Sequence, residues 1–153
     1  MTTIAGLPAH PLLVHLIVIL VPSTALLEIL CALWPAARRR LVWLVLVMAV
    51  VLTAMTPVTI NAGQWLYDRQ KDHTAILDTH AELGETMTYF AIALLVVAVA
   101  LAVLHWVQNR SDKRRMIANI AVALLALVVG IASVVQVVRV GDAGSRSVWS
   151  DQG

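Results

Sequence analysis

The segment from Leu7 to Leu30, LPAHPLLVHLIVILVPSTALLEIL, decides how the rest of the chain folds. It is apolar over a length sufficient to cross a bilayer, because a membrane helix needs about 20 residues. Two histidines, His10 and His15, lie near its start, and one carboxyl group, that of Glu28, lies deep inside it. Ionisable groups at membrane depth are costly, so these three side chains are the first candidates for function.

Composition places the whole chain among the integral membrane proteins. Of its 153 residues, 60% are hydrophobic and 13% are charged, and the mean hydropathy is +0.85. These values lie far outside the range of soluble domains. The 11 basic residues form short clusters rather than a basic face, which argues against nucleic-acid binding. The single Cys31 excludes an internal disulfide, a thiolate metal cluster and a C-x-x-C-H haem attachment.

Four apolar spans are predicted, over residues 12–34, 41–60, 85–107 and 117–140. They are continuously apolar, whereas the strands of a membrane barrel alternate inward and outward, so the spans are expected to be helices. The N-terminus lacks the positive region of a secretory signal, so the first span should remain in the mature protein. The sequence therefore predicts a single all-α membrane domain, residues 1–153, folded as an antiparallel four-helix bundle.

The polar segments between and after the spans indicate the orientation. The connections after spans one and three hold seven of the eleven Lys and Arg residues, so they are expected to be cytoplasmic. Both termini, and the hydrophilic connection WLYDRQKDHTAILDTHAELGETM after span two, should then lie on the outer side. Residues 141–153 are expected to form a short polar tail.

Several segments resemble one uncharacterised bacterial family, domain of unknown function 2231. They are AHPLLVHLIVILVPSTALLEIL, TPVTINAGQW, THAELGETM and GDAGSRSVW, of which HPLLVH is the most specific. The resemblance covers nearly the whole chain and implies a four-helix protein of the bacterial cytoplasmic membrane, with no established activity to carry over. Relatives often read GHSG where this chain has Gly141 to Gly144, so a histidine from the tail is absent here.

Four of the five histidines, His10, His15, His73 and His80, fall on the outer side of the predicted membrane. One hypothesis is a b-type haem held by His15 and His80 as axial ligands, with Gly84 one turn below His80 leaving room for the flat macrocycle. Such a haem near the outer surface would exchange electrons with a periplasmic or extracellular partner.

Other interpretations of the histidines remain open. Zinc or copper would be bound by three imidazoles and a carboxylate, from His10, His15, His80 and either Asp78 or Glu82. Alternatively, the histidines bind no cofactor and contact headgroups, water or neighbouring carboxylates. The chain would then be an accessory or assembly subunit of a larger membrane complex. No catalytic signature is present, so an enzyme acting on its own is not expected.

Glu28 belongs to a different part of the first span. It lies thirteen residues after His15, which is about 20 Å along a helix, and it points to the opposite side. It is expected to be protonated or hydrogen-bonded to a neighbouring helix, to pair with the cluster from Arg38 to Arg40, or to form part of a proton or cation pathway. In span four, Ala123, Ala126, Gly130 and Ser133 predict a close-packing helix face.

Overall fold

The computed structural model describes residues 3–4, 7–70, 74–110 and 116–149. Two strands of two residues each, β1 (Thr3–Ile4) and β2 (Leu7–Pro8), pair antiparallel before the first helix. The remainder is helical, in four long elements: α1 (Ala9–Leu33), α2 (Pro35–Tyr67), α3 (Ala75–Asn109) and α4 (Met116–Trp149).

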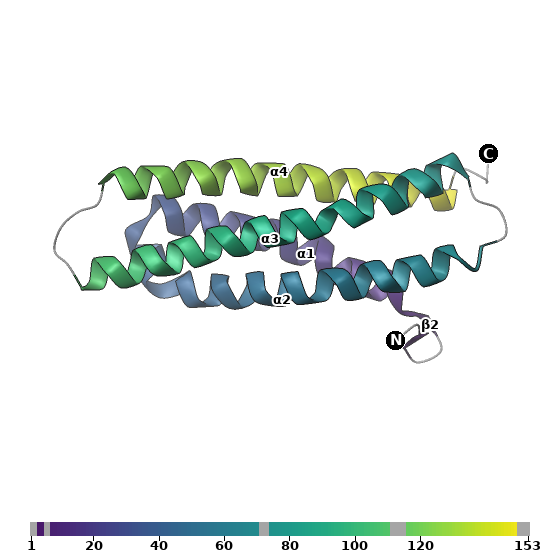
Figure 1. Cartoon of the computed structure of the whole chain (residues 1–153), viewed down its shortest axis with the longest axis horizontal. Coiled ribbons are helices and arrows are strands. Elements are labelled where there is room, and N and C mark those ends of the chain that lie inside the picture. Colours follow the sequence, from purple (N-terminus) through teal and green to yellow (C-terminus); the bar gives the residue numbers. More distant parts are fainter. Residues whose placement is uncertain (1–2, 5–6, 71–73, 111–115, 150–153) are drawn as a thin grey trace.

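The four helices form an elongated antiparallel bundle, as the sequence predicts (Figure 1). Each helix packs mainly against two neighbours, in the cyclic order α1, α2, α3, α4, so α1 and α3 lie on one diagonal. Helix α1 begins and α4 ends at the same end of the bundle. We call this end, which carries His10 and His80, the histidine end, and the opposite end, which carries Arg38, the arginine end. All four helices are long and apolar enough to cross a membrane.

The helices are longer than the predicted spans. Helices α2 and α3 have 33 and 35 residues, or about 50 Å, well beyond the roughly 30 Å of a hydrocarbon core. Much of the expected hydrophilic connection is therefore helical, and α3 begins directly after Thr74, whose hydroxyl caps it by accepting from the Leu77 amide at 3.3 Å. The prediction of a polar tail after residue 140 is also wrong, because α4 continues to Trp149. Within this extension, Arg146 and Asp142 form an ion pair at 3.1 Å.

Helices α1 and α2 are joined through Trp34 alone. Pro35 opens α2, where its missing N–H and fixed φ suit the first helical position. The arginines that follow lie inside α2 rather than in a loop, and Arg38 is buried, with only 2% of its surface exposed. Its guanidinium donates to Asn119 Oδ1 at 2.9 Å, and the Gln108 amide donates to the same oxygen at 3.1 Å.

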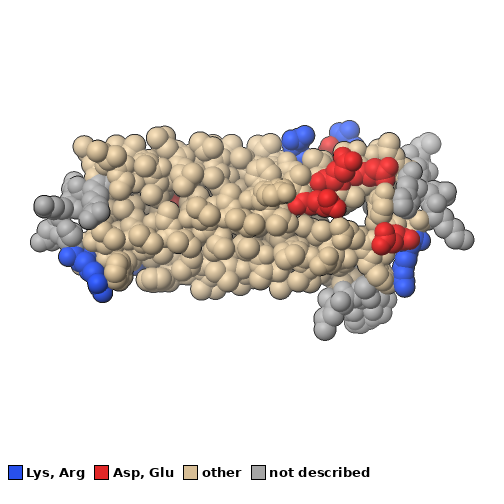
Figure 2. Space-filling view, in the orientation of Figure 1, with Lys and Arg blue, Asp and Glu red and all other residues tan. Residues whose placement is uncertain are grey.

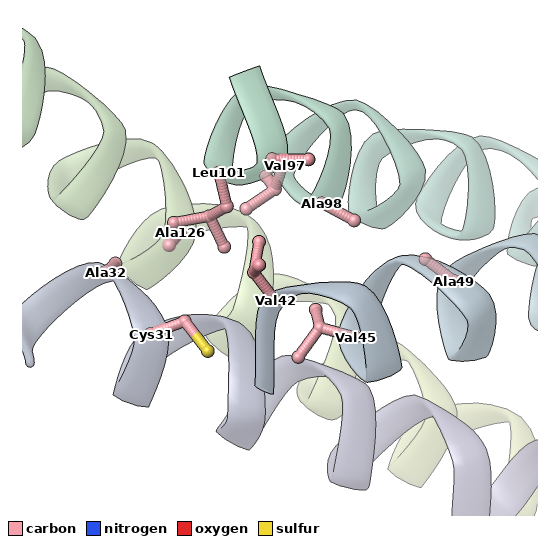
Figure 3. Packing of buried hydrophobic residues seen from close by; sticks show 10 residues of the cluster. Cys31, Ala32, Val42, Val45, Ala49, Val97, Ala98, Leu101 and Ala126 are labelled. Carbon is pink, nitrogen blue, oxygen red and sulfur yellow. The ribbon is translucent and has the colours of Figure 1, made fainter. Parts of the chain in front are cut away.

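Buried apolar side chains fill the bundle in two clusters. The first cluster lies toward the arginine end, where side chains of all four helices meet (Figure 3). The second lies closer to the histidine end and consists of Ile17, Val21, Ala25, Leu52, Met87, Ala91, Leu94 and Val137. The predicted close-packing face of α4 is confirmed, because Ala126 and Ser133 are fully buried and a Cβ on Gly130 would lie 3.0 Å from Ile29.

Replacing Leu94 by alanine tests the second cluster. Leu94 is completely buried, so Leu94→Ala should lower the free energy of unfolding by about 2 kcal/mol, near the low end for such cavities because the separated helices stay in apolar surroundings. The matched change Ile92→Ala, at a side chain that is 46% exposed, should cost less than about 0.5 kcal/mol. Unfolding in detergent, followed by circular dichroism, measures both. Equal losses would contradict the packing described.

Candidate functional site

Two histidines from diagonally opposed helices meet at the histidine end. His10 projects from the first turn of α1 and His80 from the second turn of α3. Their ring centroids lie 6.2 Å apart, and the ring planes are inclined at 77°. Both side chains are partly buried. The bundle therefore brings two imidazoles together across its central axis.

Each imidazole is anchored to the backbone of the helix beside it. The Nδ1 atom of His10 lies 3.0 Å from the carbonyl oxygen of Thr59 in α2. The Nδ1 atom of His80 lies 3.0 Å from the carbonyl oxygen of Val140 in α4. Since a carbonyl oxygen only accepts, both Nδ1 atoms must carry the proton and donate. In the neutral rings, the two Nε2 atoms then keep their lone pairs and are free to act as ligands.

A glycine one turn beyond each carbonyl makes this close approach possible. A Cβ atom on Gly63 would lie 2.8 Å from His10 Cε1, and a Cβ atom on Gly144 would lie 2.8 Å from His80 Cε1. Any side chain at these positions would push the imidazole away from the helix. Both glycines end similar tripeptides, Asn61-Ala62-Gly63 and Asp142-Ala143-Gly144. We call each imidazole, together with the carbonyl and the glycine that it contacts, a half site. The two half sites are thus built alike.

The likeness extends through the bundle, which consists of two similar helical hairpins, α1–α2 and α3–α4. Buried residues recur with identical spacing in α1 and α3: Ile17, Val21, Glu28, Cys31 and Ala32 match Met87, Ala91, Ala98, Leu101 and Ala102. In α2 and α4, buried Val45, Ala49, Leu52 and Thr56 match buried Ala126, Gly130, Ser133 and Val137. The hairpins are therefore related by an approximate two-fold axis along the bundle, and the histidine pair lies on that axis.

The bundle is not tightly closed around this pair. In the space-filling view, an opening between the helices is visible at the histidine end, bordered by acidic side chains (Figure 2). Gly84, one turn after His80 in α3, has open space beside it, since no atom lies within 4 Å of a Cβ placed there. The two helices of each hairpin thus approach closely at Gly63 and Gly144, whereas the space beside Gly84 is open.

The structure differs from the sequence-based hypothesis in the identity of one histidine. His10, rather than His15, is the partner of His80. His15 is exposed, on the face of α1 that points away from the bundle. Its Nδ1 lies 2.5 Å from the Pro11 carbonyl oxygen of the same helix. Five residues on a helix correspond to a rotation of about 140°, so the two histidines of HPLLVH cannot face the bundle together. His73 lies outside the described residues.

The predicted zinc or copper ligands are not assembled in the part of the chain that the structure describes. No three side chains from His, Cys, Asp and Glu gather there as a group able to hold a metal ion. Asp78 instead accepts a hydrogen bond from the Tyr67 hydroxyl at 2.6 Å, and Glu82 is exposed. Glu85 accepts a hydrogen bond from Gln64 at 3.1 Å. These carboxylates connect α3 to α2 or face the surface.

The sequence-based hypothesis missed the carbonyls of Thr59 and Val140 and the glycines Gly63 and Gly144. The available signal was the repeated pattern of a small tripeptide ending in glycine, four residues after each carbonyl. In a membrane helix such a pattern ordinarily marks close packing of helices. Here the group that packs against each glycine is an imidazole.

Substituting the glycines tests this arrangement. Gly63→Ala and Gly144→Ala should each lower the free energy of unfolding by about 1–3 kcal/mol, because the added methyl group overlaps the imidazole. Gly141→Ala is the matched control, since its Cβ would meet no atom within 4 Å. That variant should be neutral or up to about 1 kcal/mol more stable, as alanine favours the helix. Thermal unfolding in detergent measures all three, and a harmless Gly63→Ala would contradict the contact.

Comparison with known proteins places the chain in a family without assigning an activity. No curated protein and no solved structure matches it. Residues 6–153, nearly the whole chain, match a protein family described as predicted membrane protein, DUF2231. The match covers all four helices and both half sites. The chain therefore belongs to the DUF2231 family of predicted membrane proteins.

Proposed function

We propose that the protein binds a b-type haem between His10 and His80 and serves as an electron-transfer module in the membrane. The observation that carries this proposal is the pair of imidazoles whose Nδ1 atoms are both anchored to backbone carbonyls, so that both Nε2 atoms are available as ligands. Anchoring of the second ring nitrogen is the usual way in which proteins fix the orientation and raise the basicity of a ligating histidine.

The separation of the two rings suits one metal atom between them. A metal–imidazole bond is about 2 Å long, so two such bonds in line, with the distance from each nitrogen to its ring centre added, separate the centroids by about 6 Å. The observed value is 6.2 Å. Two imidazoles complete the axial coordination of a haem iron, whereas a zinc site needs further ligands that the described residues do not bring here.

Space between the hairpins supports a flat ligand rather than a bare ion. The open space beside Gly84 lies one helical turn from His80, and the opening at the histidine end leads between the helices. Gly63 and Gly144 keep the imidazoles close to α2 and α4, outside the space that a macrocycle would need. Cofactors in four-helix bundles are commonly held in this way, by side chains on facing helices.

The residues of this chain then have defined roles. His10 and His80 would bind the haem iron through their Nε2 atoms, and the carbonyls of Thr59 and Val140 hold both rings in one tautomer. A haem with two histidine ligands supplies one-electron transfer and has no vacant position for a substrate. Because the pair lies at one end of the bundle, electrons would be exchanged with a redox partner on that side of the membrane. The positive-inside pattern predicts that this is the outer side.

Visible spectroscopy of the purified protein tests the ligand pair. The protein produced in cells supplied with haem should show a Soret band of low-spin haem. His10→Ala and His80→Ala should each weaken haem binding by roughly 10- to 100-fold or more, because each removes an axial bond.

His15→Ala is the matched control, since this histidine belongs to the same HPLLVH segment and faces away from the bundle. Its Soret band should equal that of the unaltered protein. Loss of the band in His15→Ala, with retention in His10→Ala, would overturn the assignment. A haem-free protein that co-purifies with a stoichiometric large partner would favour the accessory-subunit interpretation.

A substitution at Gly84 tests the proposed position of the macrocycle. Gly84→Leu introduces a side chain into space that is open in the structure, so the haem-free protein should keep or gain stability. Haem affinity should fall at least tenfold, or about 1.4 kcal/mol. Haem titration and thermal unfolding of the haem-free protein measure the two effects separately. Unchanged affinity would place the macrocycle elsewhere.

A further inference from the structure

A second polar cluster lies inside the bundle, away from the histidine pair. Glu28 in α1 is completely buried, and neither of its carboxyl oxygens has a hydrogen-bond partner among the described residues. Thr24, one turn earlier on the same face of α1, is also fully buried, and its hydroxyl likewise lacks a partner there. In the same part of the structure, Arg38 keeps one unpaired guanidinium nitrogen, Nη1. Unpaired polar groups are strongly disfavoured at membrane depth and are functional candidates by default.

The approximate two-fold symmetry shows that packing does not require these groups. The residue equivalent to Glu28 in the second hairpin is Ala98, which is also completely buried and lies within the first apolar cluster (Figure 3). The residue equivalent to Arg38 is Asn119, and the two are hydrogen-bonded to each other. The first hairpin thus places a carboxyl and a guanidinium group where the second has a methyl group and an amide.

An ion pair does not account for Glu28. In the described part of the chain, the salt bridge between Arg146 and Asp142 at the surface is the one found, and the buried guanidinium of Arg38 is bonded to Asn119 instead. A carboxylate left without a cation or hydrogen-bond donor in such surroundings takes up a proton, because the neutral acid loses far less solvation. The neutral acid still has a donor and an acceptor to satisfy, as does the Thr24 hydroxyl.

Polar side chains lie on the arginine side of this cluster, and the buried Ser133 and Gln136 lie on its histidine side. The second apolar cluster, which includes Val21, Leu52 and Leu94, separates Glu28 from the histidine pair. On the other side, Arg38 is followed by the amides of Asn119 and Gln108.

We propose that Thr24, Glu28 and Arg38 form a hydrated proton-binding site in the half of the bundle toward the arginine end. Water molecules bridge the Glu28 carboxyl to the Thr24 hydroxyl and to Arg38 Nη1, and the exchangeable ligand is a proton carried by Glu28. This site is independent of haem, because it shares no residue with the histidine pair.

The other titratable groups near the cluster are few. Cys31, three residues after Glu28 on the same helix, is completely buried. On α3, His105 packs edge-to-face against Trp43, with ring centroids 6.4 Å apart, and Trp43 is itself more than half exposed. The polar side chains bonded around Arg38 from α3 and α4 are the uncharged amides already named.

Infrared spectroscopy of the full-length protein in detergent tests the proposal. At neutral pH, exposed carboxyl groups are ionised, so a carboxylic-acid C=O stretching band at that pH reports a buried acid. The unaltered protein should show one such band, which should shift in D2O because water reaches the proton and should disappear when the pH is raised. Glu28→Gln should lack the band, and Glu82→Gln, the matched change at an exposed carboxyl, should keep it.

Two substitutions of Arg38 test its part in the site. A nearby cation favours the ionised carboxyl, so Arg38→Gln should move the midpoint of the band's titration to higher pH, while Arg38→Lys, which keeps the charge, should stay close to the original midpoint. Circular dichroism verifies that each variant is folded. Absence of the band at every pH, its persistence in Glu28→Gln, or a band that does not exchange in D2O would overturn the proton-binding site. An unchanged midpoint in Arg38→Gln would remove Arg38 from it.

Discussion

The structure depends on the requirement that backbone N–H and C=O groups in a bilayer be satisfied within the chain itself. Helices meet this requirement segment by segment, which is why four long apolar helices are the outcome. A helical carbonyl, however, has a second lone pair after its bond along the helix. The carbonyls of Thr59 and Val140 offer that lone pair to His10 and His80, and glycines one turn later expose it. The backbone that spans the membrane thus also positions the candidate ligands.

Hydropathy was sufficient to predict the number of helices and their antiparallel order, because the spans are long and separated by polar segments. It did not predict their ends, since polar residues such as those of the segment from Thr74 to Glu85 also form helix when caps and neighbouring helices satisfy the backbone. Helix α4 likewise extends through residues that read as a tail. The apolar residues indicate which part of a helix lies in lipid. The ends of a helix are set instead by where its backbone hydrogen bonds stop.

The candidate site could be predicted only in part. The sequence-based hypothesis named His80 and Gly84, but it chose His15 rather than His10 as the partner of His80, because both histidines lie at the same end of one apolar helix. The choice between His10 and His15 depends on which face of α1 is buried. The buried residues Ile17, Val21 and Glu28 lie on the same face as His10. In a helix that is apolar on all sides, lipid-facing and core-facing residues look alike. The repeated tripeptides that end at Gly63 and Gly144 are present in the sequence, but only the structure shows that an imidazole packs against each glycine.

The single-residue connection at Trp34 bears on how the protein is made. With only one residue between α1 and α2, neither helix can move far from the other, so we expect the pair to enter the bilayer as one helical hairpin. His10 and Gly63 both belong to that hairpin, and their contact forms entirely within it. The carbonyl of Thr59 also belongs to it, so the first half of the site needs no residue of the second hairpin. The folded bundle can then be described as two similar helical hairpins docked face to face, each of which supplies one imidazole with its carbonyl and glycine.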